Sequence, residues 1–430
     1  MPITIVYGRG KTGESLRKLL QKQGKKVVFY DDESGFDEPN CSFANATVLL
    51  SPGVKPTARG VTLAKQFGAN IVGELQYCFP LCKAPCISIT GTNGKTTTCE
   101  LIYHILKSQG KNTLLLGNGG VPFAEKVLEC TPQDIVVLES SSFQLANCSN
   151  FAPKVSLFTN LAVDHLDYHP TITDYSLAKQ NNFVNQSRDD FSIFNADDKC
   201  AMALSQKSKA RTLFYSVNNN FANCYMANQM VHLNLFGKHQ VAPMDALADM
   251  YLHNQSNCLG AIVACAIFGV SLEQSLRAIA SFKFLPHRMQ VVANFANVTF
   301  VDDSKGTNIH ATVCACKSIQ GNIALILGGS QKGYLFDEIF QTLPAGVKYI
   351  CASGQTARDI AKCGAKYNQD VQLFEDLKDC VKGAFDAIKG VGGTVLMSNA
   401  CASFDKFKGY AQRGNYFQQV VEELKIESQF

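Results

Sequence analysis

Short apolar segments alternate with segments of helical periodicity along nearly the whole chain, and this alternation limits the fold more than any other feature of the sequence. Residues 3–7 (ITIVY) and 26–30 flank a helical pattern over residues 14–23. Two strands joined by a helix pair in parallel, so this opening predicts a βαβ unit. A parallel sheet covered by helices places the chain in the α/β class.

The alternation comes in three blocks. The first adds strands at 46–50 and 69–72 and ends near Leu81. A turn-rich segment, 282–287 (FKFLPH), separates the second block from the third. The strands expected in these two blocks are 86–90, 112–116, 135–138, 155–159 and 191–195, followed by 299–301, 323–327, 348–352 and 394–397. A chain of 430 residues is long enough for about three domains. We therefore predict three consecutive α/β domains, bounded as 1–83, 84–284 and 285–430.

Net charge and cysteine content limit the classes of protein to which this sequence can belong. The net charge of +4 is small and its sources are spread along the chain, so we expect no nucleic-acid partner and no membrane insertion. The 17 cysteines lie in apolar runs, and the opening MPITIVYG lacks a signal-type segment, which predicts reduced thiols and a cytoplasmic protein. Cys78, Cys82 and Cys86 have a spacing that could suggest an iron–sulfur site, but packing is the favoured reading. The apolar stretch 258–272 is too short to span a bilayer and predicts a buried helix.

The strongest local signal is the segment from Gly91 to Thr97 (GTNGKTT), between an expected strand and a helical pattern. Backbone N–H groups of such a glycine turn surround phosphate oxygens, a lysine neutralises their charge and a hydroxyl reaches Mg²⁺. Ile89 occupies the first glycine position of the general P-loop spacing. The segment nevertheless predicts a mononucleotide site.

A second glycine motif, Gly8, Gly10 and Gly13, follows the first strand, and two acids, Asp31 and Asp32, follow some twenty residues later. This pattern is typical of dinucleotide binding, so an NAD-dependent oxidoreductase is an alternative. A second nucleotide-like substrate, bound beside the P-loop nucleotide, fits the same observations.

Acidic residues follow two of the strands in the second block. Glu139 ends the run IVVLE, where open α/β sheets build their sites, and is a candidate Mg²⁺ ligand. A helix-terminal acid is the alternative for Glu139. Asp164, His165 and Asp167 follow the next strand and could hold a second cation, although a structural role for His165 remains open.

These motifs together resemble the Mur ligases, from Gly8 to Phe417 and in the family's order. The matching runs are ITGTNGKTTT, LESSSFQL, TNLAVDHLDYH, LHNQSN, LPHRMQ, DDSKGTN, LGGSQKG and NACASFDKFKGYAQRGNYF. The resemblance implies a Rossmann-like UDP-binding domain, a central P-loop ATPase domain and a Rossmann-like C-terminal domain. It also implies a monomeric ATP-dependent carboxylate–amine ligase that adds D-glutamate to UDP-N-acetylmuramoyl-L-alanine in peptidoglycan synthesis, using two Mg²⁺ ions.

The resemblance also assigns residues. Lys95, Lys179, His165 and Glu139 would be catalytic, with Thr96, Glu139, His165 and Lys179 at Mg²⁺ and Lys179 carried as a carbamate. ATP would be bound by Gly91, Thr92, Asn93, Gly94, Lys95, Thr96, Thr97, Asn254, Arg288, Asp303 and Lys305. The UDP-substrate would face Gly10, Thr12, Ser51, Gly53 and Asn118, and D-glutamate would face Thr307, Lys332, Ser403 and Tyr410.

The chain departs from the family pattern after its second strand. Asp31, Asp32 and Glu33 would repel a diphosphate there, unless Arg9 or Lys11 compensates. A tyrosine at 410 replaces an expected phenylalanine. Another Mur ligase, a folylpolyglutamate synthetase and a non-catalytic nucleotide-binding scaffold are further alternatives.

Overall fold

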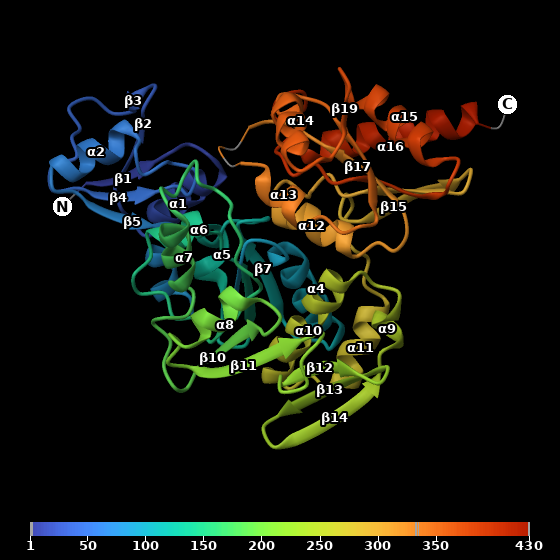
Figure 1. Ribbon diagram of the computed structural model, residues 1–430. Coiled ribbons are helices and arrows are strands. Elements are labelled where there is room, and N and C mark those ends of the chain that lie inside the picture. The colour runs from blue at the N-terminus through green and yellow to red at the C-terminus, as the bar shows by residue number, and fades with distance from the viewer. Residues whose placement is uncertain (1–2, 332, 334, 429–430) are drawn as a thin grey trace. The chain divides into compact units, whose positions relative to one another are not determined.

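A computed structural model describes residues 3–331, 333 and 335–428 (Figure 1). The chain forms two compact units. The first contains the described residues up to Leu161 together with Tyr168–Phe282. The second contains Ala162–Asp167 and the described residues from Lys283 onward. Each unit is built of mixed α/β structure, so the predicted fold class is confirmed.

The first unit begins with a five-stranded sheet in the order β3-β2-β1-β4-β5. All its neighbouring strands are parallel except β2 and β3. Its elements are β1 (Thr4–Tyr7), α1 (Lys11–Lys22), β2 (Val27–Asp31), β3 (Gly35–Phe36), β4 (Thr47–Leu50), α2 (Arg59–Gln66), β5 (Asn70–Gly73), α3 (Glu74–Cys78) and the 3₁₀ turn η1 (Phe79–Leu81). The predicted βαβ opening is therefore confirmed.

A nine-stranded sheet follows in the order β14-β13-β12-β11-β10-β9-β6-β8-β7. Its strands are β6 (Cys86–Thr90), β7 (Thr113–Gly117), β8 (Ile135–Glu139), β9 (Val155–Phe158), β10 (Phe191–Asn195), β11 (Arg211–Ser216), β12 (Cys224–Ala227), β13 (Met230–Leu235) and β14 (Lys238–Pro243). Its helices are α4 (Lys95–Ser108), α5 (Phe123–Lys126), η2 (Val127–Glu129), α6 (Ser142–Ala146), α7 (Ile172–Gln180), α8 (Lys199–Ser205), α9 (Asp245–Ala248), α10 (Leu252–Ile267) and α11 (Leu272–Ala280). After β6 the chain forms β7 and β8 on one side of β6 and then β9 on the other, so the carboxyl end of β6 is a topological switch point.

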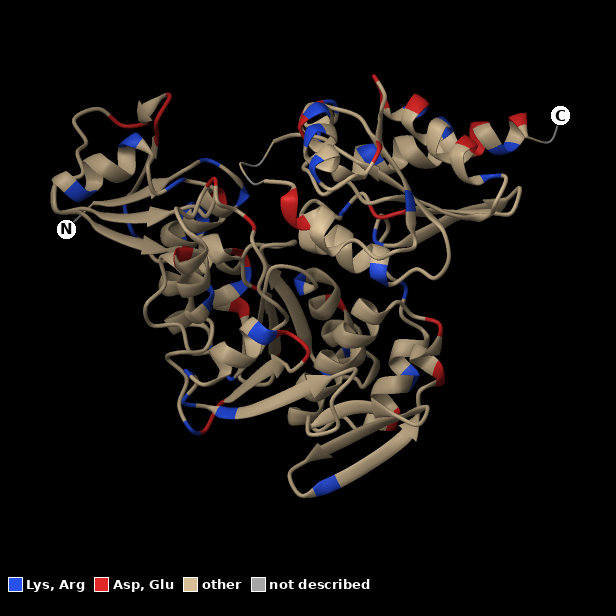
Figure 2. Ribbon diagram, in the orientation of Figure 1, with Lys and Arg blue, Asp and Glu red and all other residues tan. Residues whose placement is uncertain are grey.

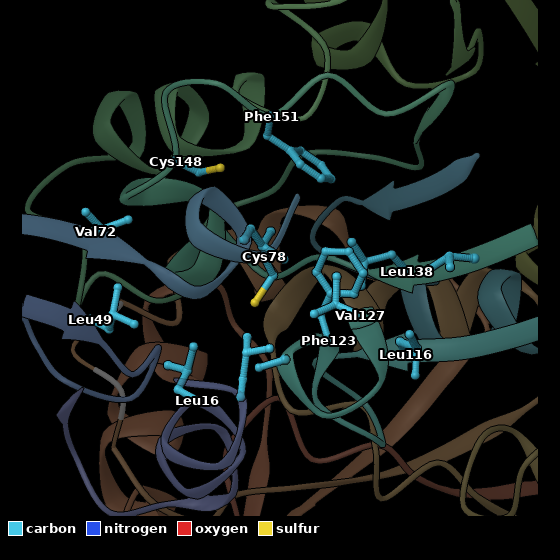
Figure 3. Packing of buried hydrophobic residues seen from close by; sticks show 14 of the residues in the cluster. Leu16, Leu49, Val72, Cys78, Leu116, Phe123, Val127, Leu138, Cys148 and Phe151 are labelled. Carbon is cyan, nitrogen blue, oxygen red and sulfur yellow. The ribbon is translucent and has the colours of Figure 1, made fainter. Parts of the chain in front are cut away.

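The two sheets of the first unit share one apolar core (Figure 3). Leu16 from α1 and Leu49 from β4 belong to the same buried cluster as Phe123 from α5 and Leu138 from β8. A buried carboxylate adds a polar link, because Glu74 accepts hydrogen bonds from Ala124 N (3.1 Å) and Gln144 Nε2 (3.2 Å). Burial raises the pKa of Glu74, and these hydrogen bonds oppose the shift.

The second unit contains a six-stranded sheet in the order β15-β16-β20-β17-β18-β19, parallel except for β15. Its elements are β15 (Gln290–Phe295), β16 (Val298–Asp302), α12 (Ile309–Lys317), β17 (Ile323–Leu327), α13 (Asp337–Thr342), β18 (Val347–Ala352), α14 (Ala357–Lys366), β19 (Val371–Leu373), α15 (Leu377–Ile388), β20 (Gly393–Met397) and α16 (Tyr410–Glu427). Strand β20 lies between β16 and β17, so the loops after these three strands meet at one edge.

Two details differ from the sequence expectations. The buried helix expected over 258–272 is two helices: α10 ends at Ile267, Gly269 has a left-handed φ of 82°, and α11 begins at Leu272. The strand pattern also missed β3, β11, the antiparallel hairpins β12–β14, β15 and β19.

Charge distribution follows the layering. Strands β6, β9 and β10 contain no Lys, Arg, Asp or Glu, whereas both signs are mixed over helices and loops (Figure 2). Strands buried between helices read as continuous apolar runs for this reason. In the described ranges, no helix combines the length and apolar character required to cross a bilayer.

Candidate active site

The glycine loop predicted from the sequence connects β6 to α4. Gly94 caps α4 with a left-handed φ of 86°, a conformation that favours glycine. A Cβ atom at Gly91 would collide with the hydroxyl of Thr159. The loop therefore requires glycine at both positions and directs the N-terminus of α4 towards the carboxyl edge of the sheet.

The end of β9 holds this loop in shape. Thr159 Oγ1 donates to the carbonyl of Asn93 at 2.6 Å. Asn160 accepts from Asn93 N through its side chain and from Thr92 N through its carbonyl, both at 2.9 Å. Thr159 and Asn160 were not predicted as site residues, although they open the run TNLAVDHLDYH.

Two lysines contact the loop from different helices. Lys95, the first residue of α4, donates to the carbonyls of Gly91 and Thr92, each at 2.9 Å. Lys179 of α7 is 1% exposed and donates to the same Gly91 carbonyl at 2.7 Å. Its ammonium also lies 4.7 Å from the centroid of the Tyr175 ring. The structure thus brings together Lys95 and Lys179, which the sequence places 84 residues apart.

Glu139 ends β8 at the same edge of the sheet. It is buried, and its Oε1 accepts a hydrogen bond from Asn118 Nδ2 at 2.9 Å. Thr96 lies in the first turn of α4. A carboxylate and a hydroxyl are hard oxygen ligands, and Mg²⁺ commonly takes only one or two protein carboxylates along with water and substrate phosphates. Glu139 and Thr96 therefore fit a magnesium ion.

Helix α10 packs against the glycine loop through an asparagine that was not predicted. A Cβ atom on Gly94 would lie 2.5 Å from Asn257 Oδ1, which also accepts from Thr98 Oγ1 at 3.3 Å. The predicted ATP residue Asn254 lies on the same helix and is buried. Both belong to the run LHNQSN, but only the tertiary structure shows that Asn257 contacts the loop.

The second glycine motif lies at the carboxyl edge of the five-stranded sheet. Gly8 has a left-handed φ of 97°, and a Cβ atom at Gly13 would collide with the carbonyl of Gly8. Ser51 Oγ donates to the same carbonyl at 3.2 Å. Gly10 caps α1, whose first turn contains Thr12. The glycine motif therefore allows α1 to pack closely on the ends of the strands. The amino end of α1 lies at the carboxyl edge of the sheet.

Two of the three acids at the end of β2 accept backbone hydrogen bonds, and the repulsion that the three would exert on a diphosphate stays a prediction. Asp32 accepts from the backbone N–H groups of Arg59 (3.1 Å) and Gly60 (2.9 Å) at the start of α2. Burial opposes ionisation of Asp32, but the Tyr7 hydroxyl and these N–H donors together lower its pKa. Asp31 accepts from Glu33 N at 3.0 Å. Asp32 is thus a cap of α2.

In the second unit, predicted nucleotide and amino-acid residues follow β16. Asp303 is buried and accepts from Ser398 Oγ at 2.6 Å, and burial raises its pKa to about 7. The ammonium of Lys305 lies 4.1 Å from the centroid of the Tyr410 ring, at the start of α16. The loop after β20 contains Ser403, which is buried. The structure thus brings Lys305 and Tyr410 together, whereas Lys332 lies outside the described residues.

A buried arginine donates hydrogen bonds to two of these loops. Arg413 of α16 donates to the carbonyl oxygens of Ser304 (2.9 Å), Cys401 (3.1 Å) and Ala402 (3.3 Å). Its contacts join the loop after β16 to the loop after β20. Arg413 was not predicted as a site residue, although it lies within the last matching run.

Comparison with known proteins identifies the family. The Mur ligase middle domain matches residues 89–265 and the Mur ligase glutamate ligase domain matches residues 287–401. The UDP-N-acetylmuramoylalanine--D-glutamate ligase of Alkaliphilus metalliredigens is 33% identical over 446 aligned residues, covering 98% of both chains. That of Caldanaerobacter subterraneus is 35% identical with the same coverage. This chain belongs to the Mur ligase family.

A solved structure supports the same fold for this Mur ligase. A pseudomurein peptide ligase type C from Methanothermus fervidus superposes with a TM-score of 0.63, covering 99% of this chain and 100% of its own, at 17% identity. At this sequence identity, the superposition supports a shared fold and nothing about activity. Three-domain α/β architecture is shared, while the exact boundaries predicted at 83/84 and 284/285 remain predictions.

His165 of this Mur ligase has an unexpected neighbourhood. The segment Ala162–Asp167 groups with the second unit, where Asp164 Oδ2 accepts from Asn308 Nδ2 at 3.0 Å. His165 has a left-handed φ of 56° and its N–H donates to Asp164 Oδ1 at 2.9 Å. Thr96, Glu139 and Lys179 belong to the first unit, so the place of His165 in the same metal set remains a prediction.

Proposed function

We propose that this Mur ligase adds D-glutamate to UDP-N-acetylmuramoyl-L-alanine at the expense of ATP, a step in the synthesis of peptidoglycan precursors. The full-length likeness to ligases of that name carries the proposal. The likeness covers 98% of this chain and 98% of each of these relatives. It favours a ligase over the oxidoreductase and scaffold alternatives.

The proposed reaction has two steps. The substrate carboxylate attacks the γ-phosphorus of ATP, which releases ADP and gives an acyl phosphate. The amine of D-glutamate then attacks the acyl carbon, and phosphate leaves as the peptide bond forms. Phosphoryl transfer of this kind is catalysed mainly by positioning and charge stabilisation, so the chain needs fixed cations and N–H donors at the phosphates.

The first unit supplies these groups. The loop from Gly91 to Gly94 offers backbone N–H groups at the start of α4, and Lys95 adds a positive charge to the same loop. Thr92, Asn93, Thr96 and Thr97 would complete the phosphate contacts. Thr159 and Asn160 fix the loop before the nucleotide binds, so little reorganisation is required during the reaction.

Glu139 and Thr96 would hold magnesium, and His165 would be a further ligand in the pair of ions that the family resemblance implies. Bound Mg²⁺ would neutralise phosphate charge. Asn118 fixes the Glu139 carboxylate by donating to Oε1 and leaves the other oxygen for a cation.

Lys179 would carry a carbamate. An ammonium beside a metal ion is electrostatically unfavourable, whereas a carbamate provides a negative charge. Carbamate formation leaves one hydrogen on Nζ, so the bond from Nζ to the Gly91 carbonyl could persist. A side chain that is 1% exposed would also hold the group away from bulk water.

The residues proposed for the remaining substrates are those that the resemblance to the Mur ligases implies. Gly10 and Thr12 follow β1, Ser51 and Gly53 follow β4, and Asn118 follows β7; these five residues would bind the UDP-substrate. Arg288, Asp303, Lys305 and Asn254 would contact ATP. Thr307, Lys332, Ser403 and Tyr410 would bind D-glutamate.

Phosphate release from ATP tests the proposal. The full chain would be assayed with UDP-N-acetylmuramoyl-L-alanine and Mg²⁺, while single amino acids are added one at a time. We expect release with D-glutamate and much less with L-glutamate or L-alanine. Release with another amino acid instead would assign a different Mur ligase activity.

A further inference from the structure

Four cysteines gather where η1 leads into β6: Cys78, Cys82, Cys86 and Cys130. The Sγ atoms of Cys82 and Cys86 lie 3.8 Å apart. Both thiols also lie 3.6 Å from the carbonyl oxygen of Ala84. The short turn between the two cysteines therefore points both sulfur atoms towards one place.

The members of this group differ in exposure. Cys86 and Cys130 are buried, whereas Cys82 is only partly buried. A solvent-borne reagent therefore reaches Cys82 first. The buried thiol of Cys86 lies next to the Cys82 thiol.

The surroundings also favour the thiolate of Cys82. Hydrogen bonds with the Cys130 and Cys86 thiols lower the pKa of Cys82, although its burial and the nearby Asp134 carboxylate oppose this shift. Cys200 offers a contrast within the same chain. It is exposed, yet partial desolvation and Asp198 raise its pKa.

We propose that Cys82 and Cys86 form a redox-active dithiol that closes a reversible disulfide when hydrogen peroxide is present. The Cys82 thiolate attacks one peroxide oxygen, the O–O bond breaks, and Cys82 becomes a sulfenic acid while the released hydroxide takes a proton from solvent and leaves as water. The sulfur of Cys86 then attacks the Cys82 sulfur, its proton leaves with the hydroxyl as a second water, and the S–S bond forms. The two cysteines are oxidised and the peroxide is reduced to two waters.

The geometry permits this closure. The sulfur atoms must approach from 3.8 Å to about 2.0 Å, a movement that a side-chain rotation of the partly buried Cys82 can supply. In the described part of the chain, no three His, Cys, Asp or Glu side chains are grouped closely enough to hold a metal ion. Dithiol chemistry thus fits this cluster better than the iron–sulfur site that the cysteine spacing could suggest.

Peptide mapping of the peroxide-treated full chain tests the proposal. We expect the loss of two hydrogen atoms and a bridge between Cys82 and Cys86, both reversed by dithiothreitol. With limiting N-ethylmaleimide on the reduced protein, Cys82 should be labelled before the more exposed Cys200. First labelling of Cys200, a bridge from Cys82 to Cys130, or no bridge would overturn the proposal.

Two variants separate the roles of the thiols. Cys86→Ser should stop the reaction at the Cys82 sulfenic acid, which dimedone would trap. Cys200→Ser, at an exposed site outside the cluster, should form the bridge as the wild type does. Failure of dimedone to label Cys82 in a folded Cys86→Ser protein would count against Cys86 as the resolving thiol.

Discussion

Lys95 and Lys179 donate hydrogen bonds to the same carbonyl oxygen, that of Gly91, at 2.9 and 2.7 Å. One lysine begins α4 and the other lies near the end of α7. Two ammonium groups are thereby directed to the first residue of the glycine loop. Because Lys95 is proposed to supply positive charge to the phosphates and Lys179 to carry a negatively charged carbamate, mutation can separate the roles of the two lysines.

Lys95→Ala should abolish ligation while the protein stays folded, because Lys95 contacts loop carbonyls rather than a core. We expect a loss of more than about 100-fold in phosphate release, the scale for removal of one preorganised charge-stabilising group. Lys107→Ala, at the exposed end of the same helix, should keep normal activity. A folded Lys95→Ala enzyme with near-normal turnover would disprove the P-loop assignment.

Lys179→Arg distinguishes a carbamate from a positive charge. A guanidinium keeps the charge but does not form a carbamate, so we expect activity as low as that of Lys179→Ala. Incubation with ¹³C-bicarbonate should give a carbamate signal in the wild type and none in Lys179→Arg. Normal activity of Lys179→Arg would mean that the positive charge is sufficient.

Asp303 should make stability depend on pH. Burial raises the pKa of Asp303 to about 7, so the folded protein keeps a proton that the unfolded chain releases at about pH 4. Between these values the folded state binds more protons, and the free energy of unfolding therefore falls as pH rises, by up to about 1.4 kcal/mol per pH unit from this group. Asp303→Asn should remove this contribution, which chemical denaturation at pH 5 to 8 would measure. An unchanged slope would show that Asp303 does not titrate there.

Asp32→Ala should destabilise the first unit through α2. The substitution removes the acceptor for the Arg59 and Gly60 N–H groups, and loss of such a cap costs about 1 kcal/mol. Glu33→Ala, one residue further along, is the control and should leave the free energy of unfolding nearly unchanged. Equal stability of both variants would contradict the capping role.

The sequence predicted the parts of the site that depend on local backbone chemistry. The glycines at 91 and 94, Lys95 at the start of a helix and Glu139 at a strand end were all recognisable from short motifs. Thr159, Asn160 and Asn257 were missed as site residues because their contacts with the loop come from residues about 65 to 165 positions away. Short motifs do not encode such distances.

Periodicity and motif order alone determined the α/β class, most strands and the family resemblance, because apolar strands buried between helices leave a local pattern. Only the tertiary structure decided what each polar group contacts. It made Asp32 a helix cap, joined the first two sheets through one core and grouped Ala162–Asp167 with the second unit. These outcomes depend on which surfaces meet in the folded chain, and side-chain hydrogen bonds form between whatever groups that packing brings within reach.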